Sequence, residues 1–218
     1  MIRRHFLWPG LLVLIGIGFT IALVRAWAIV TNQAAFATVG GVLPPGLVAE
    51  GLVAERWYAE HARLTLFHVL PGALFLAVLP LQFAGSLRRR RPALHRWIGR
   101  ILVTIGIPVA LSGLLLGGLS PFGGLTADAA IFLFGVLFLI ALSRGFVAAR
   151  RREFPTHREW MLRAAAIGAG IATVRVVAVP LYWVVGGSAL ALVGPTFWIG
   201  LGLSTAVAEW WIWYSHRR

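Results

Sequence analysis

Two His-Arg pairs stand in the same local pattern of residues. In each, a run of arginines is followed by a proline, then His-Arg, a tryptophan and a further arginine, at residues 88–100 and 150–163. The proline suits the start of a helix, which places His95 and His157 in equivalent positions at two helix starts. Free backbone N–H groups and the helix dipole favour an anion at such a place.

The chemistry that this pattern predicts is haem ligation. Two imidazoles that face each other across a bundle suit the axial positions of a b-type haem, and nearby arginines suit its propionates. We predict a haem b site with His95 and His157 as axial ligands and with Arg100 and Arg163 beside the propionates. Binding of a headgroup or another anion, and a purely structural role at the membrane boundary, remain open as alternatives.

A second group of polar residues falls inside apolar segments. Arg175 is costly to leave unpaired in a membrane, by about 2.5–3.5 kcal/mol, so we expect it to face the interior, within reach of His68 or Asp128. A carboxylate near the end of the last apolar segment, Glu209, belongs to the inner site. We predict that His68, Arg175, Asp128 and Glu209 bind a ligand, which for the outer group is an anion, a quinone-like carbonyl or a proton. Helix-end carbonyls around Pro180 are the structural alternative for Arg175.

The composition excludes most other classes. Hydrophobic residues make up 59% of the 218 residues and charged residues only 12%, against about 25% charged in soluble domains. Cysteine is absent, so thiolate metal sites and disulfides are excluded, and no metal site other than haem is predicted. No Gly-rich nucleotide motif follows a strand pattern, and no serine has a neighbouring base.

Six apolar runs are long enough to cross about 30 Å of hydrocarbon as helices. They cover residues 8–30, 64–84, 97–119, 126–149, 160–184 and 195–214. We predict an all-α bundle of six spans, in which residues 1–218 form a single transmembrane domain. Residues 31–62 form an extracytoplasmic loop with a short amphipathic helix after two prolines.

Charge sets the orientation of these spans. All twenty basic residues are arginines, and the formal net charge is +13. Sixteen of the arginines cluster at the two termini and in the loops after the second and fourth spans, and positive residues are retained on the cytoplasmic side. We therefore expect both termini to be cytoplasmic and the basic face to contact anionic headgroups, with no nucleic acid as partner.

The repeated pattern predicts internal symmetry. Residues 64–119 and 126–184 read as two copies of one helical hairpin in the same orientation, related by an axis along the membrane normal. The sites of such parallel-repeat proteins lie where the repeats meet.

This constellation resembles a family of uncharacterised bacterial membrane proteins, domain of unknown function 2306 (DUF2306). The resemblance is carried over about residues 64–185 by His68, Gln82-Phe83, Leu94-His95-Arg96 with Gly99-Arg100, His157-Arg158 with Trp160-Met161 and Arg163, and Arg175. Where the family has a glycine or small residue shortly after the first of these histidines, this chain has Pro71-Gly72. The resemblance implies a multi-span protein of the bacterial inner membrane and implies no activity.

The sequence thus favours a membrane protein with a buried His/Arg site. A redox component that carries haem b is the leading hypothesis. A carrier or binder of an anionic or lipid-like ligand, and an accessory subunit that packs on a membrane protein partner or on a second copy of the chain, are the alternatives.

Overall fold

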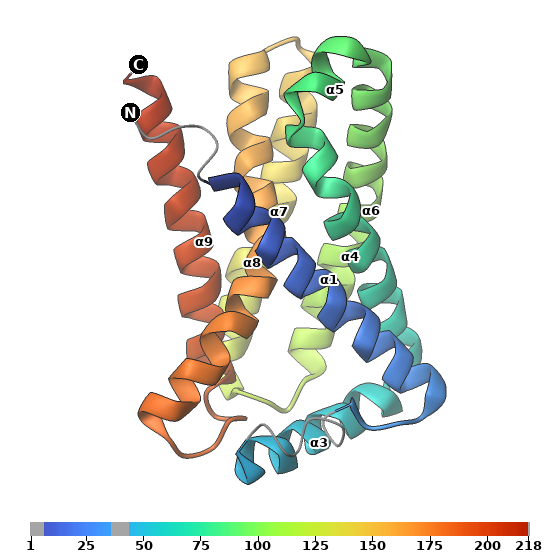
Figure 1. Ribbon diagram of the computed structural model, residues 1–218, viewed down its shortest axis with the longest axis vertical. Coiled ribbons are helices and arrows are strands. Elements are labelled where there is room, and N and C mark those ends of the chain that lie inside the picture. Colours follow the sequence, from blue (N-terminus) through green and yellow to red (C-terminus); the bar gives the residue numbers. More distant parts are fainter. Residues whose placement is uncertain (1–6, 36–43, 218) are drawn as a thin grey trace.

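The computed structural model describes residues 7–35 and 44–217, and all regular structure in these residues is helical. Within these two ranges, eight helices follow one another, as Figure 1 shows. They are α1 (Leu7–Thr31), α3 (Pro45–Glu60), α4 (Ala62–Phe83), α5 (Gly85–Arg90), α6 (Pro92–Leu119), α7 (Gly124–Arg150), α8 (Phe154–Val185) and α9 (Val193–His216).

Five of these helices are long and apolar enough to cross a membrane: α1 from Pro9, α4, α6, α7 and α8. The chain is therefore a multi-pass membrane protein. The predicted sixth span corresponds to α9, which is 24 residues long and contains four tryptophans and Glu209. It is not among these five helices. Of the arginines used to orient the chain, Arg3, Arg4 and Arg218 lie outside the described residues.

The long helices form a bundle in which those that follow one another along the chain pack antiparallel. α4 packs on α6 and α7 on α8, which gives two helical hairpins, and α9 packs along α8 and α7. α1 runs diagonally across α4 and α8, whereas α3 lies across one end of the bundle (Figure 1). We call this end the α3 end and the opposite end, which carries α5, the basic end.

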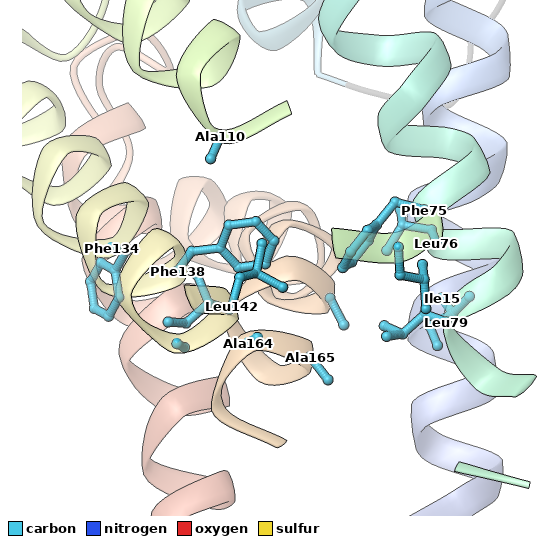
Figure 2. Packing of buried hydrophobic residues seen from close by; sticks show 14 of the residues in the cluster. Ile15, Phe75, Leu76, Leu79, Ala110, Phe134, Phe138, Leu142, Ala164 and Ala165 are labelled. Carbon is cyan, nitrogen blue, oxygen red and sulfur yellow. The ribbon is translucent and has the colours of Figure 1, made fainter. Parts of the chain in front are cut away.

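The centre of the bundle is an aromatic contact between the two hairpins. Phe75 of α4 and Phe138 of α7 meet edge to face, with ring centroids 5.7 Å apart (Figure 2). Gly168 of α8 and Gly106 of α6 lie against these rings: a Cβ on Gly168 would be 2.9 Å from Phe75, and one on Gly106 would be 3.4 Å from it. Small residues let helix backbones approach closely in membranes, so the glycines make room for the rings.

The helices at the basic end extend further than the predicted apolar runs. α6 and α8 begin at Pro92 and Phe154, five or six residues before the predicted apolar runs, and α5 was not predicted. Arginine is a good helix former, and its long side chain can carry its charge out to water. Polar residues therefore continue these helices beyond the hydrocarbon, which an apolar-run criterion cannot detect. The helix expected after the proline pair is present as α3, although residues 36–43 of that loop are outside the described part.

Candidate functional site

The two histidines of the repeated pattern lie at the basic end, in the first turns of α6 and α8. The backbone N–H of His95 donates to Arg91 and that of His157 to Glu153, so each histidine is the fourth residue of its helix. The two side chains are near enough for the charge of one to act on the other. The pattern therefore locates both imidazoles correctly at the same end of the bundle.

The two imidazoles have different surroundings. Nδ1 of His157 donates to the carbonyl of Gly145, 2.8 Å away, so Nε2 of the neutral ring carries the free lone pair. Nδ1 of His95 is buried and has no hydrogen-bond partner among the described residues. The backbone carbonyl of His95 accepts from Nε2 of Gln82 at 3.1 Å, which ties the end of α4 to the start of α6.

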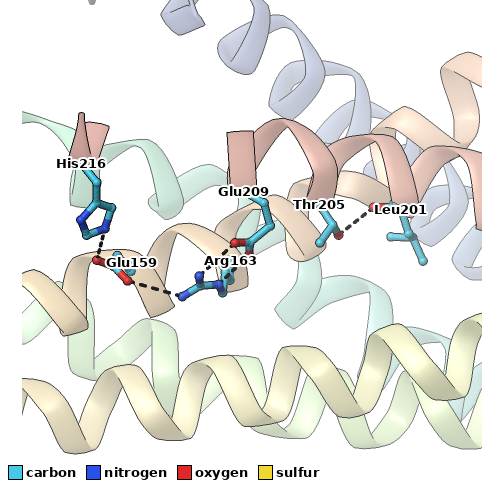
Figure 3. A network of polar contacts seen from close by, with 6 residues as sticks. All are labelled: Glu159, Arg163, Leu201, Thr205, Glu209 and His216. Carbon is cyan, nitrogen blue, oxygen red and sulfur yellow. Dashed lines mark hydrogen bonds and ion pairs between the residues drawn. The ribbon is translucent and has the colours of Figure 1, made fainter. Parts of the chain in front are cut away.

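The arginines expected beside propionates already have partners. Arg163 donates from Nε and Nη2 to the two carboxylate oxygens of Glu209, at 2.6 and 2.9 Å. Glu159 extends this network to Nη1 of Arg163 at 3.8 Å and to Nε2 of His216 at 2.8 Å (Figure 3). The guanidinium of Arg100 lies over the ring of Trp97. The network joins α8 to α9, so Glu209 acts here as the partner of Arg163 and clamps the last helix to the bundle.

His68 is engaged by α6. Its Nδ1 lies 3.0 Å from the carbonyl of Val109, to which it donates, and 3.1 Å from the hydroxyl of Ser112. A Cβ on Gly113 would be 2.9 Å from Cε1 of the ring, so glycine is needed where the imidazole meets the helix. Among the described residues, no hydrogen bond or ion pair joins His68 to Arg175 or Asp128.

Asp128 lies apart from the other predicted ligands. It lines a groove of about 320 Å³ between α6 and α7, together with Leu114, Gly118, Ala129, Ile131 and Phe132. The walls of the groove are mainly apolar. The three residues of the predicted outer group, His68, Asp128 and Arg175, thus lie in three different surroundings, and Glu209 lies with Arg163.

Arg175 is exposed on α8 rather than turned to the bundle interior as predicted. It has an unexpected neighbour, Arg25 of α1. The positive charge of Arg175 repels Arg25, whereas the carboxylate of Glu55 attracts it. The ring of Tyr58 on α3 covers Arg25, with Cζ 4.2 Å from the ring centroid. Nη1 of Arg25 is buried and has no hydrogen-bond partner among the described residues.

The path of α1 explains this pairing. Gly18 of α1 meets Ala172 of α8, where a Cβ on the glycine would be 3.2 Å from the Cβ of Ala172. Arg25 follows Gly18 by two helical turns and Arg175 follows Ala172 by about one, so both arginines lie beyond the contact, toward the α3 end. The sequence analysis assigned no role to Arg25. The sequence nevertheless contains a feature that could have indicated this pair. Of the four arginines outside the basic clusters, two, Arg25 and Arg175, stand inside apolar segments.

No group of three or more His, Cys, Asp or Glu side chains that could hold a metal ion occurs in residues 7–35 and 44–217. The donor sets of the site are therefore guanidinium groups and single imidazoles. Such donors suit anions, or the axial positions of a haem, better than a bare cation.

The sequence of the chain matches the model of one protein family. The model for a predicted membrane protein family, DUF2306, matches residues 65–212, which is more than half of the chain. The chain belongs to this family. The resemblance carried by the histidine motifs is thereby confirmed, and the DUF2306 region includes His68, His95, His157 and Arg175, whereas Arg25 precedes it. Comparisons with curated proteins and with solved structures gave no match.

Proposed function

We propose that this DUF2306 protein binds an anionic ligand between α1 and α8, at Arg25 and Arg175. The observation that carries the proposal is the buried Nη1 of Arg25, which lacks a partner beside a second guanidinium. A buried charged donor without an acceptor costs about 1–3 kcal/mol or more, and an arginine within a span adds an insertion cost of its own. An anion that accepts from both guanidinium groups removes both penalties.

The charge balance supports the same conclusion. Arg25 has both Arg175 and Glu55 as charged neighbours, so two guanidinium groups stand against one carboxylate. Guanidinium forks bind phosphate and carboxylate oxygens in bidentate geometry. The site is therefore built for one of these two headgroups.

Ligand-dependent thermal unfolding in an uncharged detergent tests the proposal. Phosphate- and carboxylate-bearing compounds, both water-soluble and chain-bearing, are added to the wild-type protein and to Arg25→Gln and Arg175→Gln. We expect at least one compound to raise the unfolding midpoint of the wild type, and either substitution to remove the effect. If no compound shifts the midpoint, or if both variants respond as the wild type does, the proposal is wrong.

A haem b bound between His95 and His157 is the second candidate. The hydrogen bond from Nδ1 of His157 to Gly145 favours it, because such a bond fixes the tautomer that leaves Nε2 for a metal. The commitment of Arg163 to Glu209 removes one of the two predicted propionate partners. When bound, a haem would supply one-electron chemistry. An absorbance spectrum before and after dithionite, with His157→Ala as control, tests for it.

For the membrane topology we propose six spans, with α9 as the sixth and both termini in the cytoplasm of a bacterium. At about 1.5 Å per residue, α9 is long enough, and its one carboxylate is neutralised by Arg163. The arginines of α5, α6 and the α7–α8 turn all lie at the basic end, which is the cytoplasmic side by the positive-inside rule.

We also propose that the two hairpins are an internal repeat. Phe75 and Phe138 are 63 residues apart, as are Trp97 and Trp160. A two-fold axis between repeats brings equivalent residues into contact with each other, which is the relation of the two phenylalanines.

A further inference from the structure

The position of the two arginines indicates which kind of anion they take. We propose that the ligand is an amphiphile, a phosphate headgroup on hydrocarbon chains, which enters from the bilayer between α1 and α8. This inference depends on the anion-binding function proposed above and adds the class of ligand and its route.

The helices α1 and α8 diverge from a single point of contact. α1 and α8 touch at Gly18 and Ala172 and separate from there toward the α3 end (Figure 1). Arg25 and Arg175 stand on the two diverging segments. A ligand that contacts both guanidinium groups therefore lies between α1 and α8, at a depth where both helices are within the membrane.

The segments of α1 and α8 around the two arginines are exposed to the bilayer. Arg175 is exposed although it stands in a membrane-spanning helix. Its neighbours on the surface of α8, Val176 and Val179, are exposed by 45% and 37%, and Leu23 and Val24 of α1 by 44% each. In a bilayer these side chains contact lipid chains, so a ligand with chains of its own loses no hydrophobic contact on binding.

Helix α3 covers the gap between α1 and α8 on the aqueous side. Tyr58 lies over Arg25, and a Cβ on Gly46 would be 2.8 Å from the Tyr182 hydroxyl at the end of α8. Glu50 accepts hydrogen bonds from the Ser188 hydroxyl at 2.9 Å and from the Leu190 N–H at 2.6 Å. α3 is thus fastened to both sides of the diverging pair, which leaves the bilayer as the open approach.

Two guanidinium groups match a phosphate headgroup better than a carboxylate. Each guanidinium carries five N–H donors in a planar fork. A phosphate monoester offers three terminal oxygens and up to two negative charges, so one headgroup can accept from both arginines at once. A single carboxylate has only two oxygens and one charge.

Three matched probes test the proposal on the full chain in an uncharged detergent. Dihexanoyl phosphatidic acid carries the phosphate and the chains, glycerol 3-phosphate carries only the phosphate, and dihexanoyl phosphatidylcholine has chains but no net charge. We expect the phosphatidic acid to bind at least about tenfold more tightly than either of the others, as judged from the concentration that raises the unfolding midpoint. We expect Arg175→Gln to weaken its binding by about tenfold or more, and Arg63→Gln, at an exposed arginine of α4, to leave it unchanged.

The three probes distinguish a failure of the amphiphile proposal from a failure of the anion site. Equal binding of phosphatidic acid and glycerol 3-phosphate would overturn the amphiphile while the anion site stands. Equal binding of phosphatidic acid and phosphatidylcholine would show that the chains alone are recognised, and would overturn both proposals. Because the three probes are first compared on the wild type, this result does not depend on whether a variant folds.

Discussion

Gly18 of α1 lies against Ala172 of α8, and the position of Arg25 relative to Arg175 depends on this contact. A Cβ at Gly18 would meet Cδ1 of Leu76 at 3.1 Å and the Cβ of Ala172 at 3.2 Å. The helices thus cross at a point where only a hydrogen atom fits easily. The angle at which they leave that point sets the separation of the two arginines at the α3 end.

Widening this contact should disturb both stability and the arginine pair. We expect Gly18→Val to lower the free energy of unfolding by about 1–3 kcal/mol, as overpacking does, and to weaken anion binding. Gly16→Val is the matched control, because nothing lies within 4 Å of a Cβ at Gly16. Denaturant titration of both variants measures the difference, and equal stability of the two would refute the crossing as described.

The pair formed by Arg163 and Glu209 should hold α9 in place. Either Arg163→Glu or Glu209→Arg alone places like charges together, so we expect each to destabilise the protein by about 1 kcal/mol or more. The double exchange restores opposite charges and should recover most of the loss. Thermal unfolding of the four proteins tests this, and a double variant no better than the sum of the single ones would mean that the contact contributes nothing.

His68 should behave as a packing residue of α4 and α6. Removal of the ring in His68→Ala takes away the hydrogen bond to Val109 and leaves a void beside Gly113, at a cost of about 2–4 kcal/mol. We expect the anion affinity of the remaining folded protein to change little. A tenfold loss of affinity at unchanged stability would instead support His68 as a ligand of the anion.

The sixth span predicts where the C-terminus lies. We use a reporter that is active only in the cytoplasm. It should be active when fused after the last residue, and inactive when fused in the 186–192 connection between α8 and α9. The same side for both fusions would mean that α9 does not cross the membrane.

The apolar runs of the sequence predicted the long helices well, because burial in hydrocarbon demands about 20 apolar residues whatever the neighbours are. The start of α8 at Phe154 was missed because its first turns are polar. The motif placed His95 and His157 at one end of the bundle. It could not show that Arg163 would be taken by Glu209, since that contact joins residues 46 positions apart through helix packing.

Arg25 shows a second limit of sequence reasoning. Its neighbour Arg175 is 150 residues away along the chain, and they meet only because α1 crosses α8 at a particular angle. The pattern of a single arginine in an apolar run carries no information on that angle. The proposed site therefore depends on tertiary packing that no motif records.

The affinity of dihexanoyl phosphatidic acid for the wild type and for the Arg25→Gln/Arg175→Gln double variant, both folded in an uncharged detergent, tests the central claim most directly. We predict saturable binding to the wild type that is weakened by a hundredfold or more in the double variant, since each guanidinium supplies charge-assisted hydrogen bonds of about 1.5–3 kcal/mol. Equal affinity for the two proteins would contradict the account.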